Sequence, residues 1–219
     1  MPLIYTQLAV DNFQRPNENP ITPANWTTVS GAVALAVVSH LCESPDAITF
    51  SADGQAFYSG VSFPPDQYAE ITLASLTPPS FVYTIARTNI GGTTGYSASC
   101  SGPFGDAAGQ IDLINETTQV TLGTRIGVLN IGDIVRLECI GTSISVKLNG
   151  STIISAVDAT EVSGLIGVNI SPFSAVGDAA ISHFAAGYIV SGSPSTAVFI
   201  GPGILKNSLG ETHQLINKL

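Results

Sequence analysis

The segment from Gly132 to Gly150 constrains the fold of this chain most. It reads GDIVRLECIGTSISVKLNG, two runs of alternating residues joined by Gly and Thr. Successive side chains of a strand point to opposite faces, so Ile144, Val146 and Leu148 share one apolar face. Asn149-Gly150 then supplies the two left-handed residues that a tight two-residue turn needs. The segment therefore predicts consecutive antiparallel strands joined by hairpin turns.

Similar short runs, separated by turn residues, extend along most of the chain. Pro-Pro and Gly-Gly pairs, which favour turns, separate several of these runs. We expect strands at Leu8–Phe13, Val33–His40, Ala47–Phe50, Ala56–Ser59, Tyr68–Ala74, Phe81–Thr88, Gly95–Ser101, Gln110–Asn115, Gln119–Leu122, Ile134–Ile140, Ile144–Leu148, Thr152–Val157, Leu165–Ile170 and Ala179–Tyr188.

The composition also favours an all-β protein. The chain has 22 Gly and 13 Pro, and only 11% of its residues are charged. A helical protein would need many Glu and Lys on its surface, whereas this surface must consist largely of Ser, Thr, Asn and Gly. At 219 residues the chain is long enough for one sandwich to bury a sound core.

These patterns resemble concanavalin A-like (laminin G-like) jelly-roll domains of the type found in uncharacterised phage and bacterial proteins. The resemblance is carried by the 132–150 hairpin, by SGLIG at 163–167, by ISHFAAG at 181–187 and by DNFQRPNENP at 11–20 followed by Trp26. It implies a sandwich of about 14 antiparallel strands with a short C-terminal tail. The fold hosts lectins, glycosidases, adhesion modules and virion proteins, so it does not fix a function.

We expect a jelly-roll domain over residues 1–190, followed by a linker and C-terminal docking tail over 191–219. SGSPS at 191–195 is typical of a linker, and AVFIG at 196–200 is compatible with one more strand. The apolar residues that follow recur at the spacing of one helical face. The residues expected to make assembly contacts are Leu205, Leu209, Ile216 and Leu219. A frayed tail, weakened by Gly210, is the alternative.

The charge of the chain argues against nucleic-acid binding. The formal net charge is −9, from 16 acidic against 7 basic residues, and the basic residues are scattered singly. No apolar run approaches the roughly 18 residues of a membrane-spanning helix, so we expect no membrane insertion. The N-terminus has neither a basic region nor a cleavage pattern typical of a signal peptide. We therefore expect synthesis in a host cytoplasm.

The cysteines fit a reducing compartment. Cys42, Cys100 and Cys139 are odd in number, lie far apart and have no CxxC spacing. Cys139 alternates onto the apolar face of its predicted strand, where it would serve as a small buried residue. We expect three free structural thiols.

The sequence lacks the carboxylate pattern of jelly-roll glycosidases, which is E-x-D-x-E on one strand. Its nearest pairs are Asp66 with Glu70 and Asp112 with Glu116. Residues four apart are separated by about 13 Å along a strand, which exceeds the span of either hydrolytic geometry. There is also no Gly-x-Ser-x-Gly motif, and the three histidines are scattered. We expect no catalytic residues and no enzyme activity.

No cofactor is expected either. His40, His183 and His213 lack the short fixed spacing of transition-metal ligands. Calcium stays open, because carboxylates from separate loops can assemble a site. The available carboxylates are Asp11, Asp53 and Asp178.

A sugar-binding interpretation depends on aromatic and planar polar groups exposed on the concave sheet. Alternation places Tyr83 and Arg87 on one face of their strand, and Tyr96 belongs to the next strand. Tyr83, Arg87 and Tyr96 are therefore the candidate ligand-binding residues. The alternative is that the aromatic rings fill the core. Trp26, the only tryptophan, is expected in the core.

These features predict a non-enzymatic structural or decoration protein of a bacteriophage-type virion, in the capsid or tail. Its partners would be other virion proteins or further copies of itself. The basis is a chain without a leader, with reduced cysteines, a polar acidic surface and an apolar tail. A lectin-like module that binds host surface glycan is the alternative, alone or combined with the virion role. A glycoside hydrolase is a third hypothesis.

Overall fold

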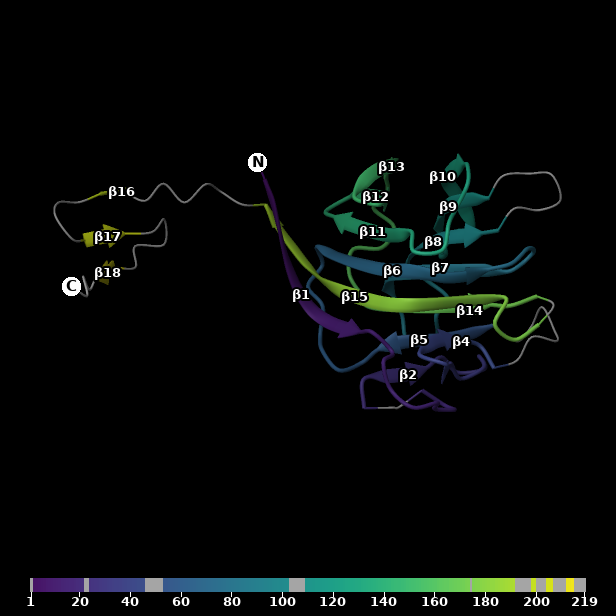
Figure 1. The fold of residues 1–219 in the computed structure, drawn as a ribbon. Helices are drawn as coiled ribbons and strands as arrows, with labels where there is room; N and C mark the ends of the chain where they lie inside the picture. Colours follow the sequence, from purple (N-terminus) through teal and green to yellow (C-terminus); the bar gives the residue numbers. More distant parts are fainter. Residues whose placement is uncertain are drawn as a thin grey trace. The chain divides into compact units, whose positions relative to one another are not determined.

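Two β-sheets, one of eight strands and one of seven, make up most of the chain in a computed structural model (Figure 1). The structure describes residues 2–21, 24–45, 53–102, 109–173, 175–191, 198–199, 204–206 and 212–214. No α-helix occurs among these residues. The all-β class predicted from the sequence is therefore confirmed, and so is the sandwich architecture.

The eight-stranded sheet has the order β13-β12-β11-β6-β15-β4-β3, and β1 also pairs with β15. Its strands are β1 (Leu3–Asp11), β3 (Ala36–Val38), β4 (Leu41–Glu43), β6 (Gln67–Leu76), β11 (Ile134–Ile140), β12 (Ser143–Leu148), β13 (Ser151–Val157) and β15 (Ala179–Ser191).

The seven-stranded sheet has the order β10-β9-β8-β7-β14-β5-β2. Its strands are β2 (Trp26–Thr28), β5 (Gly54–Tyr58), β7 (Phe81–Thr88), β8 (Tyr96–Ser101), β9 (Gln110–Asn115), β10 (Val120–Ile126) and β14 (Leu165–Ser171). Every pair of neighbours in this order is antiparallel.

The predicted hairpins at 132–150 are confirmed. β11 pairs with β12 from Val135 opposite Leu148 to Ile140 opposite Ser143. The next turn has φ of 51° at Asn149 and 82° at Gly150, and it leads into β13, which pairs with β12. Positive φ at both residues is what a two-residue turn between twisted strands requires.

The core lies between the two sheets and follows the alternation of each strand. Leu137 and Ile144 from the eight-stranded sheet, and Leu113 and Val168 from the other, are fully buried. Trp26 is 2% exposed, with its ring 4.8 Å from that of Phe184, so it belongs to the core as predicted.

The three cysteines are free and buried, as the sequence predicts. Burial raises the pKa of Cys100 and of Cys139 to about 12 and also raises that of Cys42. Since the thiolate is the reactive form, these thiols are inert packing groups.

The chain divides into two compact units, one of residues Thr6–Ile189 and one of Met1–Tyr5 with Val190–Leu219. In the second unit, β16 (Val198–Phe199), β17 (Ile204–Lys206) and β18 (Thr212–Gln214) form a three-stranded antiparallel sheet. The strand predicted at 196–200 is confirmed at its centre. The domain boundary at residue 190 stays a prediction.

The helical face predicted for the tail is wrong where the structure describes it. Leu205 lies in β17, opposite Phe199 on one side and His213 on the other, because the short segments pair with one another instead of coiling. Leu209, Ile216 and Leu219 lie outside the described residues, as do the linker residues 192–195 and the strand predicted at Ala47–Phe50. The docking role of the tail stays a prediction. Among the described residues, no helix is long and apolar enough to cross a membrane.

Candidate functional site

A row of polar side chains crosses the outer face of the seven-stranded sheet. Residues directly opposite each other in an antiparallel pair point to the same face. The registers connect one such residue from each of six adjacent strands, from β5 through β14, β7, β8 and β9 to β10. We call them the polar row: Gln55, Asn169, Tyr83, Ser99, Asp112 and Thr124.

Strict alternation in the sequence puts these residues outside. On β7, Val82 and Thr84 are fully buried on the inner side, so Tyr83 between them faces outward. On β8, Ala98 and Cys100 point into the core. The residue between them, Ser99, faces the other side of the sheet.

A hollow of about 150 Å³ opens beside Tyr83. We call it the Tyr83 hollow, and its lining residues are Asp53, Gln55, Tyr83, Ile85, Gly92, Glu116 and Asn169. Gly92 comes from the loop between β7 and β8 and has φ of 66°. A Cβ at this position would lie 2.8 Å from the Gln55 side-chain amide. Glycine therefore leaves room for both the turn and the Gln55 side chain.

Hydrogen bonds fix the polar groups of the hollow. Asp53 accepts a hydrogen bond from the Ser171 hydroxyl at 2.5 Å and one from the Asn169 amide at 3.4 Å. The Ser97 hydroxyl donates to Glu116, which also accepts from the Gln119 amide at 3.2 Å. The buried carbonyl oxygen of Asn169 has no hydrogen-bond partner in the described part of the chain. An unpaired buried acceptor is costly, so a ligand donor there would be stabilising.

The charge around the hollow is negative. Burial raises the pKa of Tyr83, a hydrogen bond with Ser99 lowers it, and the carboxylates of Asp53, Glu116 and Asp112 raise it further. The phenol therefore stays protonated at neutral pH and keeps its hydrogen-bonding hydroxyl. The described lining residues include two carboxylates and no cationic side chain.

Tyr96 is not part of this surface, contrary to the sequence prediction. It lies opposite Ala86, faces the core and is fully buried. Its hydroxyl donates to Asp158 at 2.7 Å and accepts from the Glu161 backbone N–H at 3.2 Å. Burial above all raises its pKa to about 12. Tyr96 alternates with the serines of its own strand, which is the signal in the sequence that places it inside.

Arg87 is also buried, so the predicted exposed patch is wrong for this residue too. The register of β7 against β14 shifts just before Thr88, and Arg87 has φ of 54°, so a bulge breaks the alternation there. Its side chain is 1% exposed. The guanidinium donates to the backbone oxygens of Pro65, Gly141 and Glu161 at 2.8 to 3.0 Å. Arg87 thus ties loops together, and of the three predicted residues only Tyr83 reaches the candidate surface.

The carboxylates considered in the sequence have separate structural partners. Glu70 lies on the eight-stranded sheet and pairs with Arg136 at 2.6 Å, while Asp66 accepts from the Gly141 backbone at 2.7 Å. Asp112 accepts from Gln110 and Thr124, each at 2.5 Å. No group of three or more His, Cys, Asp or Glu side chains suited to a metal ion occurs among the described residues. Asp11, Asp53 and Asp178 are therefore not assembled into one calcium site.

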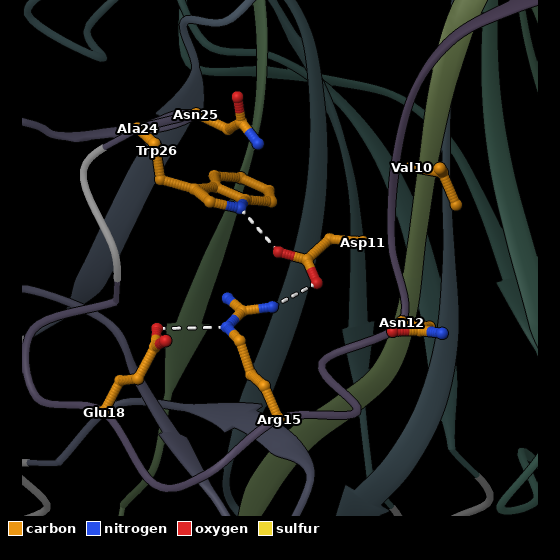
Figure 2. A pocket seen from close by; sticks show the side chains of 8 residues that line it. All are labelled: Val10, Asp11, Asn12, Arg15, Glu18, Ala24, Asn25 and Trp26. Atoms are coloured by element: carbon orange, nitrogen blue, oxygen red, sulfur yellow. Dashed lines mark hydrogen bonds and ion pairs between the residues drawn. The ribbon is translucent and has the colours of Figure 1, made fainter.

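A second concavity, of about 530 Å³, lies where β1 ends and β2 begins (Figure 2). We call it the Arg15 cleft. Its lining residues are Val10, Asp11, Asn12, Arg15, Glu18, Ala24, Asn25 and Trp26. It shares no lining residue with the Tyr83 hollow.

Comparison with known proteins identifies the fold. No protein-family model and no curated protein matches the sequence. Among solved structures, the carbohydrate-binding module CBM66 from Bacillus subtilis matches with a TM-score of 0.52 and 15% identity, over 75% of this chain and 93% of that chain. A Bacillus subtilis protein of unknown function with a galectin-like fold gives 0.57 and 12%, over 86% and 100%. The endo-β-1,3-glucanase from Pyrococcus furiosus gives 0.58 and 11%, over 86% and 96%. The chain thus has the concanavalin A-like jelly-roll fold.

Proposed function

We propose that this protein binds carbohydrate, and that the polar row with the Tyr83 hollow is its binding surface. The observation that carries the proposal is a partly exposed aromatic ring among planar polar side chains. A sugar ring has apolar C–H faces, which pack on an aromatic ring, and hydroxyls at its edge, which amides and carboxylates bind. Tyr83 supplies the ring, and Gln55, Asn169 and Asp53 supply the planar groups.

The unpaired oxygen of Asn169 supports a donor-bearing ligand. A sugar hydroxyl both donates and accepts, so sugar hydroxyls suit an acceptor such as this oxygen and a donor such as the Tyr83 hydroxyl. The likeness to a carbohydrate-binding module and to a Ca²⁺- and mannose-bound domain of VIP36, the latter with a TM-score of 0.55 and 8% identity, supports the same class of ligand. These structures favour carbohydrate binding over the virion role.

The proposed function is binding without hydrolysis. E-x-D-x-E is missing from the chain. Asp112 and Glu116 are four residues apart, and each is occupied by hydrogen bonds from neighbouring side chains. Carboxylates held in this way are poor candidates for the acid and the nucleophile or base of glycoside hydrolysis.

A glycan array followed by calorimetry on the best ligand tests the proposal. Tyr83→Ala and Asn169→Ala should each lower the affinity at least tenfold, while the melting temperature stays close to wild type. Tyr188→Ala is the matched control, because it removes a half-buried tyrosine from β15 on the other sheet. Binding to no glycan at all, or equal binding by wild type and Tyr83→Ala, would contradict the proposal.

The virion role and synthesis in a host cytoplasm stay predictions. They are compatible with carbohydrate binding, since a particle component can also attach to a glycan. Electron microscopy of purified particles with mass spectrometry of their components decides the question. Absence of the protein from every particle would leave carbohydrate binding as its only proposed role.

A further inference from the structure

The Arg15 cleft is built around a guanidinium that two carboxylates hold in place (Figure 2). Asp11 accepts hydrogen bonds from the Arg15 Nη1 at 2.6 Å, the Trp26 indole Nε1 at 2.9 Å and the Phe13 backbone at 2.8 Å. The Nε of Arg15 forms an ion pair with Glu18 at 3.0 Å. The orientation of Arg15 is therefore fixed before any ligand arrives.

Arg15 stays fully charged in this setting. Burial lowers its pKa, but the hydrogen bonds and charges of Asp11 and Glu18 outweigh burial and raise it overall. Its side chain is 26% exposed and lines the cleft.

The cleft offers hydrogen-bond donors that the protein leaves unused. The Nη2 of Arg15 carries two N–H groups and has no hydrogen-bond partner in the described ranges of the chain. Figure 2 shows this nitrogen on the side of Arg15 away from Asp11, and it shows the Asn25 amide on the other side of the Trp26 indole. Asn25 is exposed, and its side chain makes no hydrogen bond within the described ranges. Asp11, by contrast, has both oxygens occupied.

Charge decides which acceptor suits these donors. One guanidinium faces two carboxylates, Asp11 and Glu18, so the cleft carries a net negative charge, and the whole chain carries −9. An anionic ligand would be repelled. Neutral oxygens, in a hydroxyl or an amide carbonyl, accept from Arg15 or from Asn25 without that penalty. Val10, which is 48% exposed, adds an apolar side chain to the lining of the cleft.

We propose that the Arg15 cleft is a second binding site, and that it takes an uncharged sugar unit, with one acetamido carbonyl or hydroxyl oxygen on Arg15 Nη2 and another on Asn25. Its volume of about 530 Å³ lies within the roughly 300–1,000 Å³ of small-molecule pockets. The site uses no residue of the Tyr83 hollow, so either site can exist without the other.

The single tryptophan makes the cleft directly observable. Trp26 lines it, and its indole N–H gives one distinct signal in a ¹H–¹⁵N spectrum of the full chain. Titration with N-acetylglucosamine should shift this signal to saturation. Glucuronate, of similar size but negatively charged, should bind at least tenfold more weakly. No saturable shift with N-acetylglucosamine, or equal or tighter binding of glucuronate, would overturn the proposal.

Variants separate the cleft from the hollow. Asn25→Ala removes a donor that makes no bond within the described protein, so the fold should persist and the affinity should fall about tenfold, the usual effect of one lost hydrogen bond. Asn130→Ala, at an exposed asparagine outside the cleft, should leave the affinity unchanged. In Tyr83→Ala the indole shift should persist. If the indole shift disappears in Tyr83→Ala, the shift reports binding at the Tyr83 hollow, and the proposal for the Arg15 cleft is overturned. If the indole shift persists but no glycan binds at the Tyr83 hollow, only the proposed function is overturned.

Discussion

Tyr83 and Tyr96 lie on adjacent strands of one sheet and face opposite sides of it. Tyr83 is opposite Ser99 and points outward, whereas Tyr96 is opposite Ala86 and points into the core, where its hydroxyl donates to Asp158 at 2.7 Å. The two rings therefore have different roles. The ring of Tyr83 is available to a ligand. The hydroxyl of Tyr96 links the first residue of β8 to the segment after β13.

Removing one oxygen from each ring should separate stability from binding. Tyr96→Phe removes one of the donors to Asp158 and the acceptor of the half-buried Glu161 N–H, so it should lower the free energy of unfolding by roughly 1–3 kcal/mol. Glycan affinity should not change. Tyr83→Phe is the control. It should lower the glycan affinity and leave the free energy of unfolding unchanged. Urea unfolding and calorimetry measure both effects, and a Tyr96→Phe variant as stable as wild type would contradict the assignment.

Replacing Arg87 should destabilise the domain strongly. Arg87→Met keeps most of the buried volume but removes the donors to three backbone oxygens, and it should cost roughly 3–5 kcal/mol. Arg125→Met is the matched control, since Arg125 donates to a single exposed carbonyl at 3.3 Å and should cost at most about 0.5 kcal/mol. Chemical denaturation of both variants tests this. Equal losses would mean that Arg87 does not hold the loops.

Asp158 should give the domain an acid-sensitive contribution to stability. Burial alone would raise its pKa, but hydrogen bonds from Tyr96, Thr160 and Asn115 lower it from 3.8 to about 2. Because the folded state holds this proton less tightly than the unfolded state, the stabilisation is complete above about pH 4 and disappears as the pH falls toward 2.

The measurement is the unfolding free energy of wild type and Asp158→Asn between pH 6 and pH 2. The difference between them should be constant down to about pH 4 and then shrink. A difference that grows on acidification would show that the pKa of Asp158 is raised instead.

A methyl group at position 92 should obstruct the Tyr83 hollow. The Cβ of Gly92→Ala would lie 2.8 Å from the Gln55 amide, so this side chain has to move away from the polar row. The positive φ of 66° adds a backbone strain of roughly 1–2 kcal/mol. Glycan affinity should fall severalfold. Gly91→Ala is the neighbouring control, because its Cβ would approach nothing closer than 3.5 Å, and it should bind like wild type.

Much of the fold could be predicted from alternation and turn residues alone. The strands at Phe81–Thr88, Gln110–Asn115 and Ile134–Ile140 have the predicted bounds, and Gln110–Asn115 alternates between core and outside over its whole length. The apolar run from Val33 to His40 was predicted as one strand. In the structure only Ala36–Val38 of this run forms a strand, β3, and a turn with positive φ at Ser39 and His40 ends the run before β4 begins at Leu41. Neither Ser39 nor His40 indicates such a turn in the sequence.

The candidate site was harder to predict, because it depends on pairing between distant segments. Gln55 and Asn169 meet Tyr83 only through the order β5-β14-β7, which local patterns do not contain. The bulge at Arg87 depends on the same pairing. The tail shows the opposite error, since apolar spacing compatible with a helix at Leu205 belongs to a strand. Local periodicity cannot weigh a partner strand that is not yet placed.

The polar row also has a shape. Neighbouring strands lie about 4.8 Å apart, and each is rotated by roughly 20–25° relative to the last. Across the six strands of the row, the direction of the side chains therefore rotates progressively from one strand to the next. A straight oligosaccharide bound along the row would contact only a few of these side chains. An oligosaccharide that twists in the same sense as the sheet would contact all of them. The twist of the ligand, as well as its hydroxyl pattern, would therefore set how its affinity grows with its length.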